Sequence, residues 1–492
     1  MIPNFLSRYR PRYIRSLIYM LQSCEYNVRD YLAWYRRTKD FSSVEVRKQL
    51  VKTPKATGLF VIIWIIVIFC VVGAVQYVGS TGSDISLVIG VLLVLALPFY
   101  LPYVIIIPVL LARVIQKPFE YALMKRARKK LELHQGLRVA IAGSFGKTSM
   151  REILKTVLSE GEAPTPQGRG PDRSVGRKKV AAPPFSHNTP IGICRFINGL
   201  NGDEEVLIFE LGEYYPGDVM KLCKLIDPQI GVITGINEAH LEKFGTLEKT
   251  AGTILELSEY MKDKPIYMNG ENGLARKHAS GNHILYSRDG AGDFKTEDLR
   301  TGLTGTNFTM VKDGIKLPAS SKLLGLHNVG PLLVAACIAS KLGYTSAQTQ
   351  AGIAKTKAFN HRLEPSEDKN GVITIDDSYN GNPDGVNAII EFLSSIKGHR
   401  RWYVTPGLVE MGARTEEVHK EIGRHLARSG IEKIVLIKDS VTSFIEWGLK
   451  DSGYAGEIIW FNDALQAYSA LPHLTVKGDI VLLQNDWPDQ YS

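Results

Sequence analysis

Residues Leu137–Met150, which read LRVAIAGSFGKTSM, join a short apolar run to a glycine-rich turn and the start of a helical pattern. This order is typical of a loop that wraps a nucleotide phosphate, because glycines let backbone N–H groups approach the phosphate and the helix presents its positive end. Lys147 supplies a positive charge, and the Thr148 hydroxyl is a ligand for Mg²⁺. Ile141 stands where the common pattern G-x-x-x-x-G-K-[ST] has its first glycine. An ordinary strand–turn–helix corner is the alternative. The expected phosphate-binding residues are Gly143, Ser144, Gly146, Lys147, Thr148 and Ser149.

After this loop, short runs rich in β-branched residues alternate with helical stretches, which predicts a parallel α/β fold. Residues 302–316 lack helical periodicity and predict a β-rich elaboration at a sheet edge. A break near 355–359 separates two α/β units. The expected strands are Val206–Phe209, Ile230–Thr234, Pro265–Met268, Ile373–Ile375, Trp402–Val404, Lys433–Ile437, Ile458–Trp460 and Asp479–Leu483, and the expected helices include Met150–Ser159 and Val329–Leu342.

One segment after the phosphate loop does not fit a packed unit. Gly161–Pro184 is rich in Gly, Pro and basic residues and has almost no apolar periodicity. We interpret it as a mobile insertion. A solvated loop is favoured over one that closes on substrate phosphates.

The N-terminal part contains two apolar segments that are long enough to span a bilayer. Gly58–Gly79 has no charged residue, and Ile85–Ala112 is nearly as apolar. The short connection Ser80–Asp84 makes them a hairpin with both ends on one side. No cleavage site follows convincingly, so a signal peptide is not expected.

Basic residues flank this hairpin and predict its orientation. Residues 1–56 carry twelve Lys/Arg against four Asp/Glu, and more basic residues follow residue 112, whereas the whole chain has a net charge of +9. Positive flanks place both termini and the later domains in the cytoplasm, as a multi-pass protein of the cell (inner) membrane. The charge favours anionic membrane lipid as a partner and argues against nucleic acid. Ile14, Leu17, Ile18 and Leu21 repeat at helical spacing and predict an amphipathic helix in the membrane interface, with pairing to another subunit as the alternative.

Polar side chains follow several expected strands, at the edge where α/β proteins place their sites. Glu210 ends one strand and is a candidate Mg²⁺ ligand. His240 lies just past another, with structural and ligand roles equally open. Asn328 precedes an apolar helix, and capping of that helix would be enough to explain the presence of an asparagine there. Asp376 and Asp377 end a third strand and either contact a ribose or lysine or make a turn.

Eight segments, taken in order, resemble the Mur ligase family of peptidoglycan synthesis. They are AGSFGKTS, HNTPIG, ELGEYYPGDV, GINEAHLEKFGTLE, GLHNVGPLLVAA, HRLE, IDDSYNGNP and TPGLVEMG, and the resemblance covers residues 137–492. It is strongest to members that add D-alanyl-D-alanine. The resemblance implies a P-loop-type central ATP-binding domain and a Rossmann-like C-terminal domain. We therefore expect segments of 1–56 (basic, amphipathic), 57–112 (hairpin), 113–135 (basic linker), 136–358 (central domain) and 359–492 (C-terminal domain).

The family's reaction activates a carboxylate with ATP as an acyl phosphate, which an amine then attacks. The resemblance assigns Lys147, Glu210 and His240 to catalysis, and Thr148, Glu210 and His240 to Mg²⁺. It places Asn269, His327 and Asn328 near adenine, and Arg362 and Asp377 near the ribose and phosphates. Substrate contacts are expected from Asn188, Tyr379, Asn380 and Asn382.

The chain departs from the family pattern at three places. The lysine that becomes carbamylated in the family aligns with Ile254, and Glu256 is the only nearby acid. The hairpin replaces the N-terminal uridine-nucleotide domain. The C-terminal Lys-Gly-Ser segment of the most similar family members is replaced here by Gln484-Asn485-Asp486. The identity of the amine substrate therefore stays open.

We expect an ATP- and Mg²⁺-dependent ligase that joins D-alanyl-D-alanine or another amino acid or dipeptide to a small-molecule cell-wall precursor. A catalytically degenerate, membrane-bound ATP-binding scaffold is the alternative that Ile254 motivates. A simple ATPase is a weaker third hypothesis.

Overall fold

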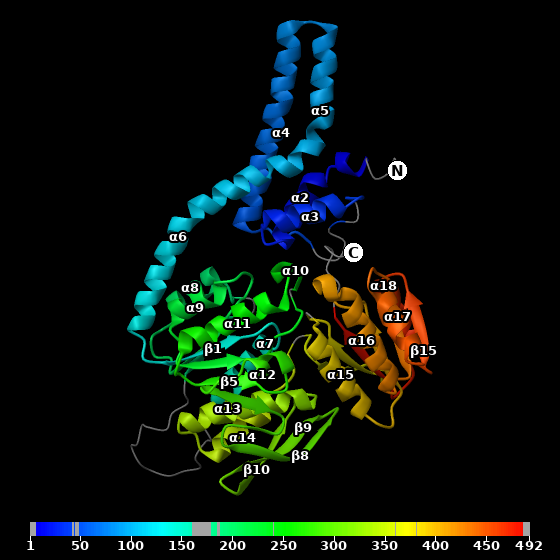
Figure 1. The fold of residues 1–492 in the computed structure, drawn as a ribbon. Helices are drawn as coiled ribbons and strands as arrows, with labels where there is room; N and C mark the ends of the chain where they lie inside the picture. Colours follow the sequence, from blue (N-terminus) through cyan, green and yellow to red (C-terminus); the bar gives the residue numbers. More distant parts are fainter. Residues whose placement is uncertain are drawn as a thin grey trace. The chain divides into compact units, whose positions relative to one another are not determined.

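A computed structural model describes residues 6–41, 44, 49–159, 179–184, 187–239, 241–359, 361–379 and 381–485. The chain divides into two compact units, residues 1–122 and residues 123–486 (Figure 1).

The first unit is helical, and a long hairpin dominates it (Figure 1). Gly82 adopts a left-handed conformation (φ 59°) that ends the first hairpin helix, and Ser83 caps the second by accepting a hydrogen bond from the Ser86 N–H. Both hairpin helices are long and apolar enough to cross a membrane and expose most of their large apolar side chains. The described helices are η1 (Ser7–Tyr9), α2 (Tyr13–Ser23), α3 (Val28–Arg37), α4 (Pro54–Thr81), α5 (Asp84–Val104) and α6 (Ile106–Glu132).

Helix α2 corrects the prediction of a helix lying in the membrane interface. Leu17, Ile18 and Leu21 are fully buried in a cluster that includes Leu59 of α4 and Leu101 of α5. The amphipathic pattern of α2 therefore matches an intramolecular contact with the hairpin, which periodicity alone does not distinguish from a lipid contact.

The second hairpin segment and the linker after it also differ from prediction. Helix α5 ends at Val104, and α6 begins at Ile106 and continues to Glu132. Residues expected to form a basic linker at 113–135 are therefore mostly helical.

The second unit begins with a large sheet. In the described residues it has ten strands in the order β10-β9-β8-β7-β6-β5-β4-β1-β3-β2. The strands from β2 to β6 pair in parallel, and β7 to β10 add antiparallel pairs. The strands are β1 (Leu137–Ala142), β2 (Val180–Ala181), β3 (Val206–Glu210), β4 (Ile230–Ile233), β5 (Ile266–Asn269), β6 (His283–Ser287), β7 (Gly290–Ala291), β8 (Phe294–Gly302), β9 (Gly305–Lys312) and β10 (Ile315–Ser321).

Helices cover both faces of this sheet, and each face has its own apolar core (Figure 1). One core joins α7, α13 and α14 to the sheet, and the other joins α8, α9, α11 and the end of α6. The helices are α7 (Lys147–Ser159), α8 (Pro190–Gly199), α9 (Asp218–Ile226), α10 (Leu241–Phe244), α11 (Leu247–Met261), α12 (Gly273–Lys277), η2 (Leu326–Asn328), α13 (Val329–Lys341) and α14 (Ser346–Lys355).

A second sheet follows with the order β11-β12-β16-β13-β14-β15, parallel except for β11. The predicted parallel α/β architecture is confirmed, as are the predicted strands to within two residues at their ends. Its elements are β11 (Glu364–Glu367), β12 (Ile373–Asp377), α15 (Pro383–Ser395), β13 (Arg401–Thr405), η3 (Gly412–Arg414), α16 (Thr415–Arg428), β14 (Lys433–Ile437), α17 (Thr442–Asp451), β15 (Glu457–Phe461), α18 (Ala464–Leu474) and β16 (Ile480–Gln484).

Two further predictions have different outcomes. Strands β9 and β10 confirm the β-rich elaboration at a sheet edge. The predicted insertion at 161–184 lies mostly outside the described residues. Its end is ordered, however, because Val180 and Ala181 form β2 and pair with β3.

Candidate active site

The loop between β1 and α7 has backbone conformations that require glycine. Gly143 has φ 145°, and a Cβ atom there would lie 2.2 Å from Thr234 Oγ1. Gly146 has φ 72°. The loop therefore packs closely on the end of β4 and opens the N-terminus of α7, where backbone N–H groups attract anions.

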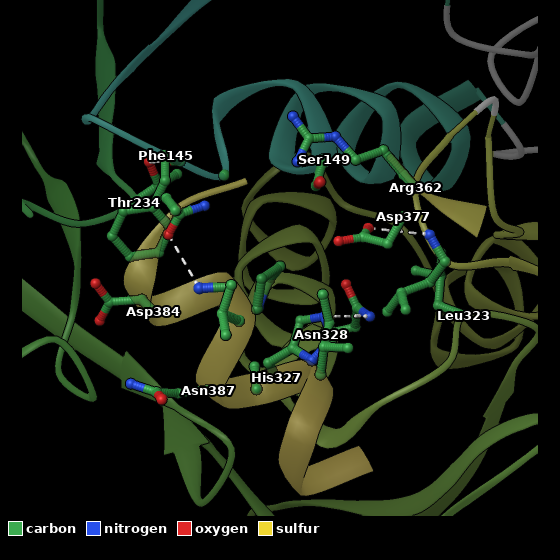
Figure 2. A pocket seen from close by; sticks show the side chains of 18 of the residues that line it. Phe145, Ser149, Thr234, Leu323, His327, Asn328, Arg362, Asp377, Asp384 and Asn387 are labelled. Atoms are coloured by element: carbon green, nitrogen blue, oxygen red, sulfur yellow. Dashed lines mark hydrogen bonds between the residues drawn. The ribbon is translucent and has the colours of Figure 1, made fainter. Parts of the chain in front are cut away.

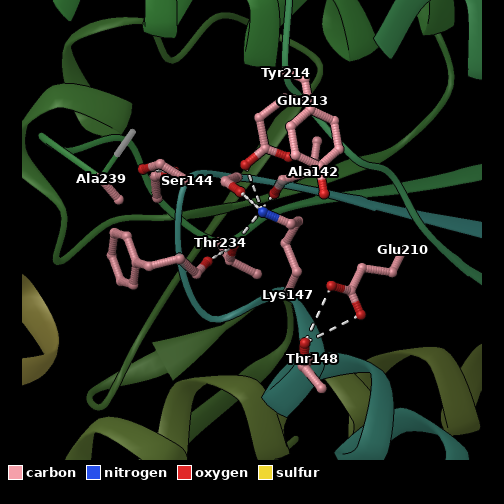
Figure 3. A network of polar contacts seen from close by, with 12 residues as sticks. Ala142, Ser144, Lys147, Thr148, Glu210, Glu213, Tyr214, Thr234 and Ala239 are labelled. Atoms are coloured by element: carbon pink, nitrogen blue, oxygen red, sulfur yellow. Dashed lines mark hydrogen bonds and ion pairs between the residues drawn. The ribbon is translucent and has the colours of Figure 1, made fainter. Parts of the chain in front are cut away.

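Lys147 is the first residue of α7, and its ammonium lies against a carboxylate (Figure 3). Lys147 Nζ is 2.5 Å from Glu213 Oε1 and also donates to the Gly143 carbonyl. The Glu213 side chain is only 2% exposed and that of Lys147 10%. The charge expected to meet phosphate thus already has a buried counter-ion.

Thr148 and Glu210 meet on the same side of the loop (Figure 3). Thr148 Oγ1 lies 3.1 and 3.2 Å from the two Glu210 carboxylate oxygens. Buried Arg151 donates to Glu210 at 3.2 Å. A hydroxyl and a carboxylate at a helix N-terminus form an oxygen donor set of the kind that Mg²⁺ prefers, so these residues fit that ion.

A pocket of about 460 Å³ lies beside the loop, and Figure 2 shows side chains that line it. Gly146 and Ser149 of the phosphate loop line it, together with residues of both sheets. This volume is within the usual range for small-molecule sites. Gly146 and Ser149 therefore line the pocket, while Lys147 and Thr148 between them contact the carboxylates of Glu213 and Glu210.

The wall from the second sheet carries Asp377 and Gln484, which are paired in register at the carboxyl ends of β12 and β16. Burial raises the pKa of Asp377 to about 7, while Arg362 and the Leu363 N–H oppose the shift. Gln484 Oε1 accepts hydrogen bonds from the Tyr403 and Thr405 hydroxyls. This wall combines a carboxyl group that titrates near neutrality with the Arg362 cation.

The opposite wall carries Asn269, His327 and Asn328. Asn269 Nδ2 donates to the Thr234 carbonyl at 2.9 Å. Burial and the neighbouring Arg288 lower the pKa of His327 to about 4, and Glu391 opposes the shift. His327 is therefore neutral at physiological pH, and its ring adds polar atoms to the pocket without charge.

Asn328 does not cap helix α13 through its side chain, contrary to the structural role considered for it. Its Nδ2 instead donates to the Leu324 carbonyl at 2.8 Å. The side chain fixes the turn before α13, which leaves Asn328 in place at the pocket wall.

Polar contacts tie the two sheets together around the pocket. Asn237 Nδ2 donates to Asn382 Oδ1 at 2.9 Å and to Asp384 Oδ2 at 2.7 Å. The Asn237 backbone N–H donates to Ser144 Oγ at 2.8 Å, which connects the phosphate loop to this contact. Arg288 and Glu391 form an ion pair across the same gap at 2.6 Å.

The structure brings most of the predicted site residues to two neighbouring places. Asn188 and Tyr379 do not line the pocket: the Asn188 carbonyl accepts from the Gly212 N–H, and exposed Tyr379 lies 4.9 Å from the Arg362 guanidinium carbon. His240 and Asn380 lie outside the described residues. The pocket-lining predicted residues are Gly146, Ser149, Asn269, His327, Asn328, Arg362, Asp377 and Asn382.

Sequence reasoning missed Glu213, Arg151, Asn237 and Asp384. Glu213 stands three residues after Glu210, just past the end of β3. This position near the carboxyl end of a strand is the sequence feature that could have indicated it as a site residue. No local signal marks Asp384, because its partners are Asn237, in the loop after β4, and Asn272, the N-cap of α12, both more than 100 residues earlier.

Ile254 lies on α11 and is fully buried in the core between that helix and the sheet. Glu256 accepts hydrogen bonds from the backbone N–H groups of Gly217 and Met220, at the start of α9. Within the described residues, Glu256 thus caps a helix, and Ile254 fills the core.

Two family models match the second unit. The Mur ligase middle domain matches residues 141–339, and the Mur ligase glutamate ligase domain matches residues 361–484. Together they cover about two thirds of the chain, including the phosphate loop and both pocket walls.

Individual relatives and solved structures are similar over the same region. UDP-N-acetylmuramoyl-tripeptide–D-alanyl-D-alanine ligase of Bacillus subtilis is 24% identical and covers 74% of this chain and 76% of its own length. The Escherichia coli enzyme of that name is 27% identical, over 61% of this chain and 64% of its own length. The crystal structure of the MurF ligase of Thermotoga maritima in complex with ADP matches with a TM-score of 0.62 and 24% identity, over 75% of this chain and 80% of its own.

Proposed function

Because the chain belongs to the Mur ligase family, we propose that it is an ATP-dependent amide-forming ligase of peptidoglycan precursor synthesis. The proposed acceptor is a UDP-N-acetylmuramoyl-tripeptide or a related precursor, and the proposed amine is D-alanyl-D-alanine, after the names of the relatives. The observation that supports this proposal most directly is the phosphate loop, which lies beside a pocket lined by residues of both ligase domains.

The first step needs ATP held with its γ-phosphate exposed to a carboxylate. We assign the adenosine part to the pocket walls of Asn269, His327 and Asp377, and the phosphates to the N-terminus of α7. A carboxylate oxygen of the acceptor attacks the γ-phosphorus, the bond to the β-phosphate oxygen breaks, and ADP leaves. Lys147 is placed to stabilise the negative charge of the transferring group.

The second step forms the amide. The amine of the incoming dipeptide adds to the acyl phosphate carbonyl, giving a tetrahedral intermediate, and loses a proton. Inorganic phosphate then leaves with one oxygen from the original carboxylate. ATP is needed because a carboxylate is a poor electrophile until its oxygen becomes part of a good leaving group.

Thr148 and Glu210 are the described residues that would hold Mg²⁺, and His240 remains a proposed ligand. The ion, when bound, neutralises the phosphate charge during transfer. Arg151 holds the Glu210 carboxylate toward Thr148. The chain itself therefore orients the proposed donor set.

We also propose that α4 and α5 anchor the protein in the cell membrane with both termini in the cytoplasm. Both helices expose apolar side chains over most of their length, and basic residues follow the second one. Confinement at a membrane raises the effective concentration of a lipid-linked precursor.

Phosphate release tests the proposed function. The detergent-solubilised protein is given ATP and Mg²⁺ with the muramoyl tripeptide, with D-alanyl-D-alanine, with both and with neither. Release that needs both substrates and disappears in Lys147→Ala supports the ligase. Release independent of both substrates would contradict it.

A degenerate ATP-binding scaffold is the second candidate function. It is favoured by Ile254, whose buried side chain offers no metal ligand. A scaffold would bind ATP, and Lys147→Ala would weaken this binding. It would form no amide with any precursor.

A further inference from the structure

We propose that Glu213 is a built-in counter-ion for the phosphate-loop lysine and makes nucleotide binding depend on a divalent cation. The inference rests on the proposed function, since it requires nucleotide phosphates at this loop. It assigns a role to a residue that the ligase motifs do not single out.

The contact between Lys147 and Glu213 is buried and close. Lys147 Nζ and Glu213 Oε1 are 2.5 Å apart, and the two side chains are 10% and 2% exposed. Removing one partner from a buried ion pair leaves an uncompensated charge, which is costly. Lys147 is therefore held by Glu213 until another group competes for it.

The cations around the loop are paired with carboxylates before any ligand binds, and the carboxylates outnumber them. Lys147 pairs with Glu213, and Arg151 pairs with Glu210 and Glu152. These two cations thus face three carboxylates. Nucleotide phosphates at the start of α7 therefore contact the helix N-terminus, but both of these cations are already paired with a carboxylate.

A divalent cation changes this balance. Its two positive charges offset the carboxylates, and Lys147 is then shared between Glu213 and a phosphate, since an ammonium has three donors. Without the cation, Glu213 repels the phosphates and competes for Lys147. Glu213 therefore discriminates between the metal complex of the nucleotide and the free nucleotide.

Nucleotide binding with and without metal tests this role. ADP binding to the full-length protein in detergent is measured by calorimetry, in excess Mg²⁺ and in EDTA. Glu213→Gln keeps the shape and a hydrogen-bond acceptor for Lys147 but removes the charge. We expect its affinity for metal-free ADP to rise by about tenfold, as for one nearby charge, and its dependence on Mg²⁺ to shrink correspondingly.

Glu152→Gln is the matched control. It also removes one carboxylate near the phosphate loop, but Glu152 lies on α7 and pairs with Arg151 rather than with Lys147. We expect its ratio of affinities with and without Mg²⁺ to stay within about twofold of the original. Thermal denaturation checks folding of each variant, and Glu213→Ala provides the same measurement if Glu213→Gln does not fold.

An unchanged ratio in a folded Glu213 variant would overturn the inference and leave the proposed function standing. An equal change in Glu152→Gln would also overturn it, because the effect would then be general charge removal. The original protein failing to bind ADP under both conditions would instead contradict the proposed function.

Discussion

Lys147 is the residue on which both the phosphate site and its buried counter-ion depend. Lys147→Ala removes the charge proposed to meet the transferring phosphoryl group and leaves Glu213 without this partner. We expect ATP-dependent amide formation to fall by at least about 100-fold, a loss typical of removing one preorganised charge contact. Steady-state kinetics measure it, and a fall of less than tenfold in a folded variant would contradict the assignment.

Asp377 gives the site a pH dependence. Burial raises its pKa to about 7, above the value of about 4 in an unfolded chain. The folded protein therefore binds this proton more tightly, and the associated stability is present at low pH and is lost as the pH rises through 7. We expect the melting temperature of the original protein, minus that of Asp377→Asn, to decrease between about pH 5 and pH 8. A difference that grows with pH would contradict the raised pKa.

Local sequence predicted which residues form the loop before α7, but it did not predict their distant contact partners. Gly143, Gly146 and Lys147 are specified by their own short segment, because a phosphate loop is built from consecutive residues. The partners Glu213, Asn237 and Asp384 come from three distant segments, and their meeting depends on tertiary packing. Glu210 was correctly expected near the loop, yet its contact with Arg151 was not.

Helix α15 joins element stability to the pocket. Asn382 caps its N-terminus by accepting from the Gly385 N–H, and the same Oδ1 accepts from Asn237. We expect Asn382→Ala to destabilise the protein by about 1–2 kcal/mol, the usual cost of a lost cap, and to weaken nucleotide binding. Chemical denaturation and ADP titration measure the two effects.

Thr345→Ala is the control for that prediction, since Thr345 caps α14 through a capping box. Its loss should be similarly destabilising, but nucleotide affinity should not change because Thr345 does not line the pocket. Equal ADP affinity in the two variants would contradict the role of Asn382 at the pocket.

At the scale of elements, short apolar runs predicted most of the parallel strands of both sheets, because parallel strands are buried on both faces. Helix α2 was predicted to lie in the membrane interface, but its apolar face is covered within the protein. An amphipathic helix shows only that one face is covered, and here α4 and α5 contribute to the cover. The helical continuation of α6 past residue 113 was also missed, since its basic composition resembles a linker.

At the scale of the molecule, the two units predict separable behaviour. We expect the full chain to remain in the membrane fraction after alkaline carbonate extraction, because α4 and α5 have the length and apolar surface of spanning helices. A chain beginning at Leu123 retains the second unit and should fractionate as a soluble protein. Release of the full chain by carbonate would contradict the anchor.

The most direct test follows oxygen from the substrate carboxylate into phosphate. The muramoyl tripeptide, labelled with ¹⁸O in its terminal carboxylate, is incubated with the protein, ATP, Mg²⁺ and D-alanyl-D-alanine, and the released phosphate is analysed by mass spectrometry. An acyl phosphate ligase transfers one labelled oxygen to each phosphate as the amide forms. Unlabelled phosphate would show that ATP is only hydrolysed, and would contradict the account.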